Sequence, residues 1–122
     1  TLVPIAYATI LYLVGGWQYV IWGYCISTVI VYHATFSINS LAHSYGSKNY
    51  HTKDHSRNNW WLAIITLGEG WHNNHHYWPS SVRQGFNFLQ IDITFYLLKI
   101  LEKLGLIWSM RSPPKEVLDA SR

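Results

Sequence analysis

Residues 17–42 read WQYVIWGYCISTVIVYHATFSINSLA, an apolar run without Asp, Glu, Lys or Arg. A transmembrane helix needs about 20 apolar residues, so this run is long enough to cross a membrane with some tilt. The charge-free region is longer still, because residues 1–47 hold none of the 9 Lys and Arg or the 6 Asp and Glu residues. A buried helix pair in a soluble protein is hard to reconcile with so long an uncharged stretch, and we therefore predict an all-α membrane protein.

A second apolar run, residues 5–14, precedes the first but is too short to span. Because Gly15-Gly16 offers a turn between the two runs, we predict a transmembrane hairpin over residues 1–43 whose first helix is re-entrant or, as we favour, truncated.

A secretory signal peptide is excluded, since there is no basic leading region and no cleavage site. The single Cys25 also excludes a disulfide framework. A chain of 122 residues that opens with Thr1 is expected to be a fragment of one domain.

Basic residues follow the long run, and the glycine turn has none. Lys48, Lys53 and Arg57 therefore predict that everything from Lys48 onward faces the cytoplasm. This basic patch is small and flanks a span, so we expect no nucleic-acid partner. We predict a cytoplasmic helical cap over residues 44–112 and a polar tail over residues 113–122. Within the cap, a helix from about residue 88 to 104 ends at Gly105 and is predicted to lie on the bilayer, with a core-facing helix as the alternative.

The histidines concentrate in Gly68-Glu69-Gly70-Trp71-His72-Asn73-Asn74-His75-His76. If this stretch is helical, His72, His75 and His76 stand at i, i+3 and i+4 and project from one face. A single histidine is usually a packed or surface side chain, but three on one helical face after two glycines favour a metal site. Imidazole suits iron, zinc, copper or nickel, so the cluster alone does not choose the metal.

Four further histidines lie outside this stretch. His43 shares a helical face with Asn39 at the cytoplasmic end of the long run, and both are predicted to point towards the cluster. His33 lies roughly 120° away around the helix and is interpreted as a hydrogen-bonded interior residue. His51 and His55 are also four residues apart, but they sit among charged residues in a polar stretch, residues 44–59, that we interpret as a solvated loop.

Two motifs resemble those of the membrane acyl-lipid and acyl-CoA desaturases, the stearoyl-CoA Δ9-desaturase family. The histidine cluster is similar to the third histidine box of that family, and Asn39-Ser40-Leu41-Ala42-His43 is similar to its asparagine–histidine pair at the end of the fourth transmembrane helix. The separation of the two motifs agrees with the family, and the resemblance extends over most of the chain. Trp71 and Asn74 resemble bacterial members more than animal ones.

The resemblance implies an oxidoreductase with a di-iron centre on the cytoplasmic side that uses O2 and electrons to introduce a double bond, Δ9 by analogy, into an acyl chain. It also implies the site residues. His43, His72, His75 and His76 are the expected iron ligands, Asn39 reaches iron through a water, and Glu69 accepts a hydrogen bond from a ligand imidazole. The first two histidine boxes of the family are absent from this sequence, so we expect the isolated polypeptide to be inactive.

The resemblance further implies partners and a location. The substrate is a fatty acyl chain carried by coenzyme A, a carrier protein or a lipid, and the electron donor is a protein such as cytochrome b5 or ferredoxin. We expect a multi-pass protein in contact with membrane lipid, with the bacterial inner membrane favoured over the endoplasmic reticulum. Phe36 and Tyr32 precede Asn39 by three and seven residues on nearly the same stripe, and they either line the acyl chain or pack against neighbouring helices.

The same residues are compatible with other functions. A hydroxylase or alkane oxygenase of the same superfamily shares the chemistry up to C–H cleavage. A zinc-dependent membrane hydrolase could use His72, His75 and His76 as ligands and Glu69 as base, but this leaves Asn39 and His43 unexplained. A non-catalytic metal-handling or transport protein is the third alternative.

Overall fold

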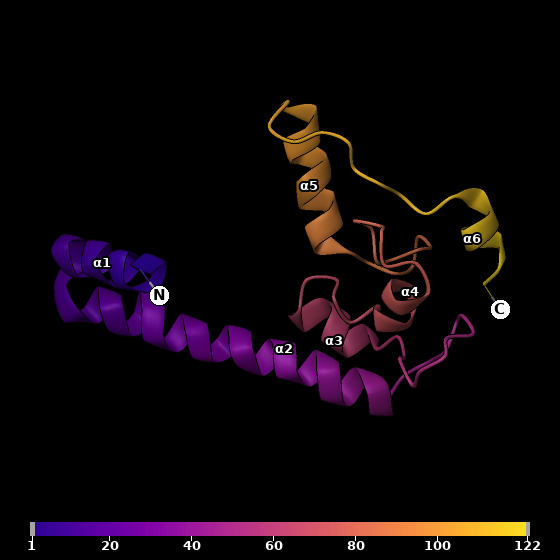
Figure 1. Ribbon diagram of the computed structural model, residues 1–122, viewed down its shortest axis with the longest axis horizontal. Helices are drawn as coiled ribbons and strands as arrows, with labels where there is room; N and C mark the ends of the chain where they lie inside the picture. The colour runs from indigo at the N-terminus through magenta and orange to yellow at the C-terminus, as the bar shows by residue number, and fades with distance from the viewer. Residues whose placement is uncertain (1, 122) are drawn as a thin grey trace. The chain divides into compact units, whose positions relative to one another are not determined.

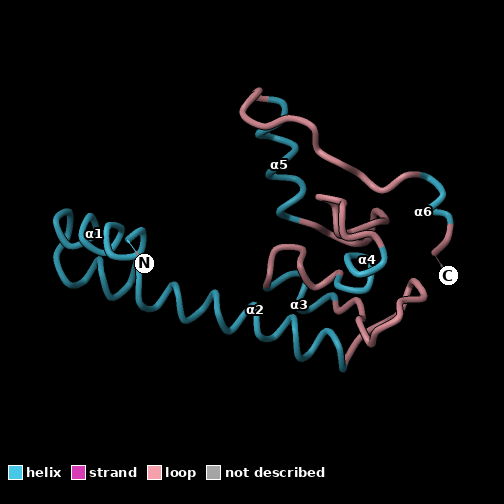
Figure 2. Tube along the Cα trace, in the orientation of Figure 1, coloured by secondary structure: helices cyan, strands magenta, loops and turns pink. Residues whose placement is uncertain are grey.

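The computed structural model describes residues 2–121, which form helices joined by loops without any strand (Figure 2). The all-α class is therefore confirmed for these residues. Pairing of extended backbone is limited in them to isolated bridges of Asn58 with Ser47 and Trp71. The helices, labelled in Figure 1 except for the π-helix η1, are α1 (Leu2–Val20), η1 (Ile21–Ile26), α2 (Ser27–Ser44), α3 (Trp60–Ile65), α4 (His72–Tyr77), α5 (Ile93–Lys103) and α6 (Lys115–Asp119).

The chain divides into two compact units, Thr1–Phe36 and Ser37–Arg122. In the first unit α1 is broken at Gly15 and Gly16, and Gly16 has φ +65°, a conformation that glycine adopts without strain. The chain reverses there, so that the segment before the glycines lies beside the segment after them (Figure 1). The Tyr7 hydroxyl donates a hydrogen bond of 3.3 Å to the carbonyl of Gly23, and its ring packs edge-on against Tyr24.

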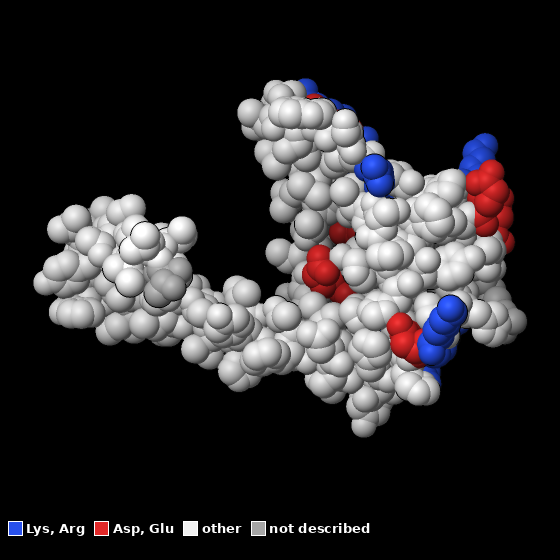
Figure 3. Space-filling view, viewed as in Figure 1, with Lys and Arg blue, Asp and Glu red and all other residues white. Residues whose placement is uncertain are grey.

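Among the described residues, the one helical stretch long and apolar enough to cross a membrane is Leu2–Ser44. Its large apolar side chains are exposed: Leu13 is 76%, Trp22 70% and Ile30 62% accessible. No Lys, Arg, Asp or Glu interrupts this surface, and no blue or red atoms appear on the part of it that Figure 3 shows. An extended apolar surface of this kind is expected against lipid or another protein segment.

In the second unit, α3 and α4 lie close together because Gly70 has no side chain. A Cβ atom on Gly70 would lie 2.0 Å from the backbone nitrogen of Ala63 in α3. The Gly70 carbonyl accepts a hydrogen bond of 2.8 Å from the Asn59 backbone. Asn59 also caps α3, since its side-chain oxygen accepts from the backbone of Leu62 at 3.1 Å.

Helix α5 begins later than predicted. Its first residue is Ile93 rather than a residue near Phe88, because Asp92 is the N-cap and accepts from the backbone of Phe95 at 3.0 Å. The predicted end is confirmed: the cap is Leu104, and Gly105 follows with φ +71°. The buried Asp92 also accepts from the backbone of Gln84 at 2.6 Å, which ties the preceding loop to the start of the helix.

The C-terminal stretch predicted as a polar tail contains α6, and its Val117 is buried. Val117 packs with Tyr50 and Phe86 in a small apolar core, to which Tyr77 and Leu118 add partly buried surface. This core ties the chain after α5 to the loop between α2 and α3.

Candidate metal centre

The C-terminal end of α2 and the short helix α4, both in the second unit, supply the histidines. His43 lies in the last turn of α2, while α4 begins at His72 and carries His75 and His76 at i+3 and i+4. The stretch from His72 is therefore helical, which is the condition under which the three histidines share a face. Helix α4 has only six residues, so its stability must come from packing and side-chain hydrogen bonds rather than from its own propensity.

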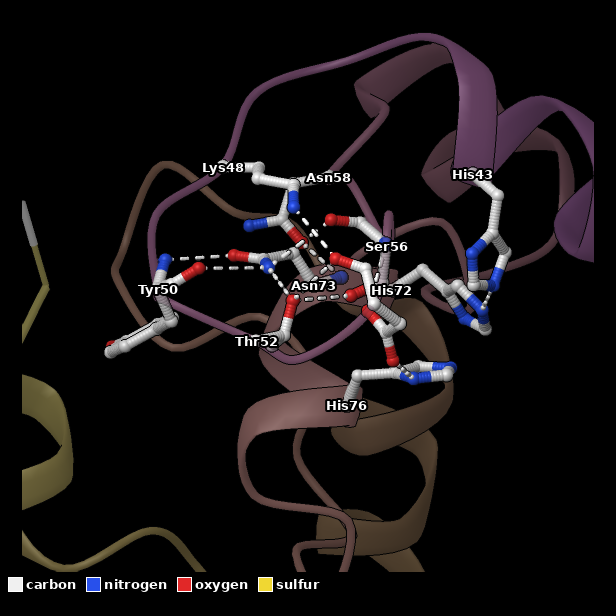
Figure 4. A network of polar contacts seen from close by, with 10 residues as sticks. His43, Lys48, Tyr50, Thr52, Ser56, Asn58, His72, Asn73 and His76 are labelled. Carbon is white, nitrogen blue, oxygen red and sulfur yellow. Dashed lines mark hydrogen bonds and ion pairs between the residues drawn. The ribbon is translucent and has the colours of Figure 1, made fainter.

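Three of the histidines converge. One ring nitrogen from each of His43, His72 and His76 lies within 4.8 Å of the others, and no other group of His, Cys, Asp or Glu among residues 2–121 does the same. The Nε2 atoms of His43 and His72 are 3.1 Å apart, and a dashed line joins the two rings in Figure 4. Two imidazole nitrogens bound to one transition metal, each about 2.1 Å from it, lie roughly 3 Å apart. The spacing therefore fits a shared metal ion.

The electrostatics of the cluster also suit a cation. Burial, together with charge repulsion from the neighbouring His76, His43 and His75, lowers the pKa of His72 to about 4. Burial likewise lowers the pKa of His75, while the negative charge of Glu69 opposes that shift. Because His72 and His75 stay neutral near pH 7, each keeps a lone pair for a metal ion.

His75 adds a second observation. Its Nδ1 is buried and has no hydrogen-bond partner among the described residues. A buried polar atom without a partner costs free energy, so this nitrogen indicates a group that these residues do not supply. The donor set of neutral imidazoles and this buried nitrogen together fit a bound transition metal.

The other predicted site residues have different surroundings. Asn39 is exposed one turn before His43 on α2, and Glu69 is half-buried. Within the first unit, Tyr32 and Phe36 are 58% and 63% exposed and stack on each other with ring centroids 6.0 Å apart. His51 and His55 are exposed and lie outside the converging group, as expected for a loop.

Asn73 is not among the site residues predicted from the sequence, yet it is fully buried beside two of the histidines. Its side-chain oxygen accepts from the backbone of Asn49 at 2.9 Å and of Tyr50 at 2.8 Å. Its amide nitrogen donates to the carbonyls of Tyr50 and Ser56, at 3.1 and 3.2 Å (Figure 4). One side chain on α4 thus holds the loop that precedes α3.

Asn58 and Asn74 extend this network. The Asn58 side-chain oxygen accepts from the backbone nitrogens of Asn73 and Asn74, at 2.9 and 3.2 Å, and so satisfies the N-terminus of α4. Asn74 donates to the Gln84 carbonyl at 2.7 Å and to Gln90 at 2.8 Å. The interpretation of residues 44–59 as a solvated loop is therefore wrong for Ser56 and Asn58, which are 0% and 3% exposed. The many Asn, Ser and Thr residues in this loop and next to the histidines of α4 were the sequence feature that could have indicated the network.

Asp54, from the same loop, contacts the cluster directly. Its Oδ2 lies 2.5 Å from Nδ1 of His76. Burial raises the pKa of Asp54, but hydrogen bonds from Ser56, His76 and Thr52 outweigh that effect and hold the pKa well below its usual range. No spacing pattern in the sequence pairs Asp54 with His76.

The comparisons with known proteins concern the sequence and point to one family. A family model described as fatty acid desaturase matches residues 1–101. A delta-9 desaturase-like protein of Arabidopsis thaliana is 50% identical over 105 residues, which cover 86% of this chain and 35% of that protein. The sn-1 stearoyl-lipid 9-desaturase of Synechocystis is 41% identical over 117 residues, 96% of this chain and 37% of that protein. An acyl-CoA C20 Delta5-desaturase of Anemone leveillei is 43% identical over 106 residues, 87% and 34% respectively.

This chain therefore spans about a third of the length of the curated relatives it matches. The match includes both His43 and the α4 histidines, since residues 1–101 contain α2 and α4. With the family model matching most of its length, the chain belongs to the fatty acid desaturase family.

Proposed function

We propose that this chain is the C-terminal part of a membrane acyl desaturase that introduces a double bond, at the Δ9 position, into an acyl chain. The observation that carries the proposal is the convergence of His43 from α2 with His72 and His76 from α4. The sequence around them is 41 to 50% identical to proteins named as 9-desaturases or desaturase-like. We propose Δ9 because two relatives are named as delta-9 desaturase-like and 9-desaturase. A relative named as a Delta5-desaturase shares the same region.

The proposed cofactor is a di-iron centre. His43, His72, His75 and His76 would hold it, with Asn39 acting through a water and further histidines coming from the preceding part of the protein. When bound, the irons supply the O2-dependent redox chemistry that removes two hydrogens from the acyl chain. The residues of this chain would bind the irons and orient the ligand imidazoles. Burial keeps His72 and His75 neutral, and Glu69 is proposed to accept a hydrogen bond from a ligand imidazole.

The proposed setting is a multi-pass protein of the bacterial inner membrane. Residues 1–43 form the transmembrane hairpin, residues 44–112 the cytoplasmic cap and residues 113–122 the tail. The exposed apolar surface of Leu2–Ser44 and the basic residues after it support this arrangement. Tyr32 and Phe36 are proposed to line the acyl chain. The partners are an acyl-CoA, acyl-carrier or lipid substrate and an electron donor such as cytochrome b5 or ferredoxin.

Metal and product analysis of the full-length protein test this function. We expect two iron atoms per full-length polypeptide and an unsaturated fatty acid as the product. Substitution of His43, His72, His75 or His76 by Ala should in each case lower the iron content. His51→Ala and His55→Ala are the matched controls and should keep the iron. One zinc per chain would support a hydrolase instead, a hydroxylated product an oxygenase. Loss of iron on changing His51 but not His43 would overturn the ligand assignment.

A further inference from the structure

His76 is contacted by a carboxylate from outside its own helix. Nδ1 of His76 lies 2.5 Å from Oδ2 of Asp54, in the loop between α2 and α3. An ionised carboxylate only accepts hydrogen bonds, so Nδ1 is the nitrogen that carries the proton. The lone pair that can bind a metal ion is then on Nε2.

We propose that Asp54 is a positioning residue for the metal centre, which fixes the tautomer and the orientation of the His76 ring so that Nε2 is the metal-binding atom. The inference rests on the proposed function, because it requires a metal in the cluster of His43, His72 and His76. A carboxylate that accepts from a ligand imidazole also raises the basicity of the metal-binding nitrogen.

Asp54 is itself held in place. The backbone nitrogen of Ser56 donates to its Oδ1 at 2.9 Å, and Lys48 donates to its carbonyl at 2.7 Å. Asn73 anchors the same loop, since its amide nitrogen donates to Thr52 and to the Ser56 carbonyl at 3.3 and 3.2 Å. Helix α4 therefore carries both His76 and the amide that fixes the loop holding Asp54 (Figure 4).

The solvent exposure of the Asp54–His76 pair distinguishes an effect on the orientation of the His76 ring from an effect on the stability of the fold. The side chains of His76 and Asp54 are 30% and 39% exposed. Ion pairs with this access to water contribute little to the free energy of unfolding. Loss of the Asp54–His76 contact by itself should therefore weaken metal binding far more than it destabilises the protein.

The test is the rate at which iron leaves the full-length, iron-loaded protein in the presence of a colorimetric Fe(II) chelator. Asp54→Ala should release iron about 10- to 100-fold faster than the parent. Asp54→Asn keeps one accepting oxygen, which cannot serve both Ser56 and His76, so its rate should lie between the two. His55→Ala changes the next residue, which is exposed, and should stay within about twofold of the parent.

A second measurement keeps the result interpretable if Asp54→Ala folds poorly. The Tm of the metal-free protein should be nearly unchanged in Asp54→Asn, whose side-chain oxygen can still accept from the Ser56 backbone, while the rise in Tm on loading with iron should shrink. Unchanged iron release, or a metal-free Tm that falls in step with faster release, would overturn the positioning role. A parent protein that binds no iron would instead overturn the proposed function itself.

Discussion

Asn73 shows how one side chain can organise the site without being a metal ligand. It is fully buried and bonds to three backbone groups of Tyr50 and Ser56 as well as to Thr52 and the Asn49 backbone. Its position between His72 and His75 couples the histidine face of α4 to the loop that holds Asp54. A polar residue between histidines suggests a metal ligand, but the hydrogen bonds of the Asn73 side chain all go to the loop that precedes α3.

At Asn73 we predict a large loss of stability. Asn73→Ala would leave several buried backbone donors and acceptors unpaired, at about 1–3 kcal/mol each, so the total loss should exceed about 3 kcal/mol. Thermal unfolding of the full-length protein in detergent measures it. Asn87→Ala is the matched control, because Asn87 is exposed and water can replace its bonds. Equal falls in Tm for the two variants would contradict the role assigned to Asn73.

A further prediction concerns Phe36 and the length of the acyl chain that the enzyme accepts. If its ring lines the acyl chain, Phe36→Ala in the full-length enzyme should change the distribution of product chain lengths while the iron content stays constant. Gas chromatography of the fatty acids and metal analysis of the same sample check both parts. Ile30→Ala, an equally exposed apolar site in the same unit, is the control. A product distribution that does not change, combined with lower stability, would leave Phe36 with a packing role.

At the scale of elements, short helices depend on their neighbours. Helices α3 and α4 have six residues each, too few to be stable alone, and Asn59 and Asn58 supply the acceptors at their N-termini. Gly70 completes the arrangement by letting the chain before α4 approach the backbone of α3. The orientation of the α4 histidines thus depends on contacts with α3 and its cap.

Gly70→Ala should disrupt this contact. The new Cβ would meet the Ala63 nitrogen at 2.0 Å and the Asn59 carbonyl oxygen at 2.6 Å, and backbone atoms cannot move aside cheaply. We expect a loss of about 3 kcal/mol or more and a lower iron content in the full-length protein. Gly105→Ala is the comparison: a Cβ atom placed there would meet no atom of a non-neighbouring residue within 4 Å, so only the φ of +71° matters, at about 1 kcal/mol. The two Tm values should differ clearly, and a Gly70→Ala protein as stable as Gly105→Ala would contradict the close contact.

For the whole molecule, the uncharged surface of Leu2–Ser44 and the charged residues after Ser47 predict a membrane topology. Cysteines are placed singly in a Cys25→Ser background of the full-length protein, because Cys25 is exposed and would itself react. In intact bacteria, a membrane-impermeant maleimide should label Trp17→Cys, next to the glycine turn. Lys53→Cys should react only after permeabilisation. Labelling of Lys53→Cys from outside would reverse the proposed orientation.

The sequence by itself determined the features that depend on local pattern. A long uncharged run predicts helix, Gly105 ends α5 because glycine tolerates a left-handed conformation, and the spacing of His72, His75 and His76 places them on one helical face. Asn39 and His43 share a face for the same reason. These properties follow from the 3.6-residue period and from the conformational freedom of single residues.

Only the tertiary structure decided which loop residues meet the cluster. Asp54 contacts His76, and Asn73 is hydrogen-bonded to the loop that precedes α3. The physical reason is that a polar side chain has the same local signature whether water or a buried backbone group is its partner. Hydrogen bonds between residues 15 to 25 positions apart leave no periodic trace, so the fold alone shows which of them form.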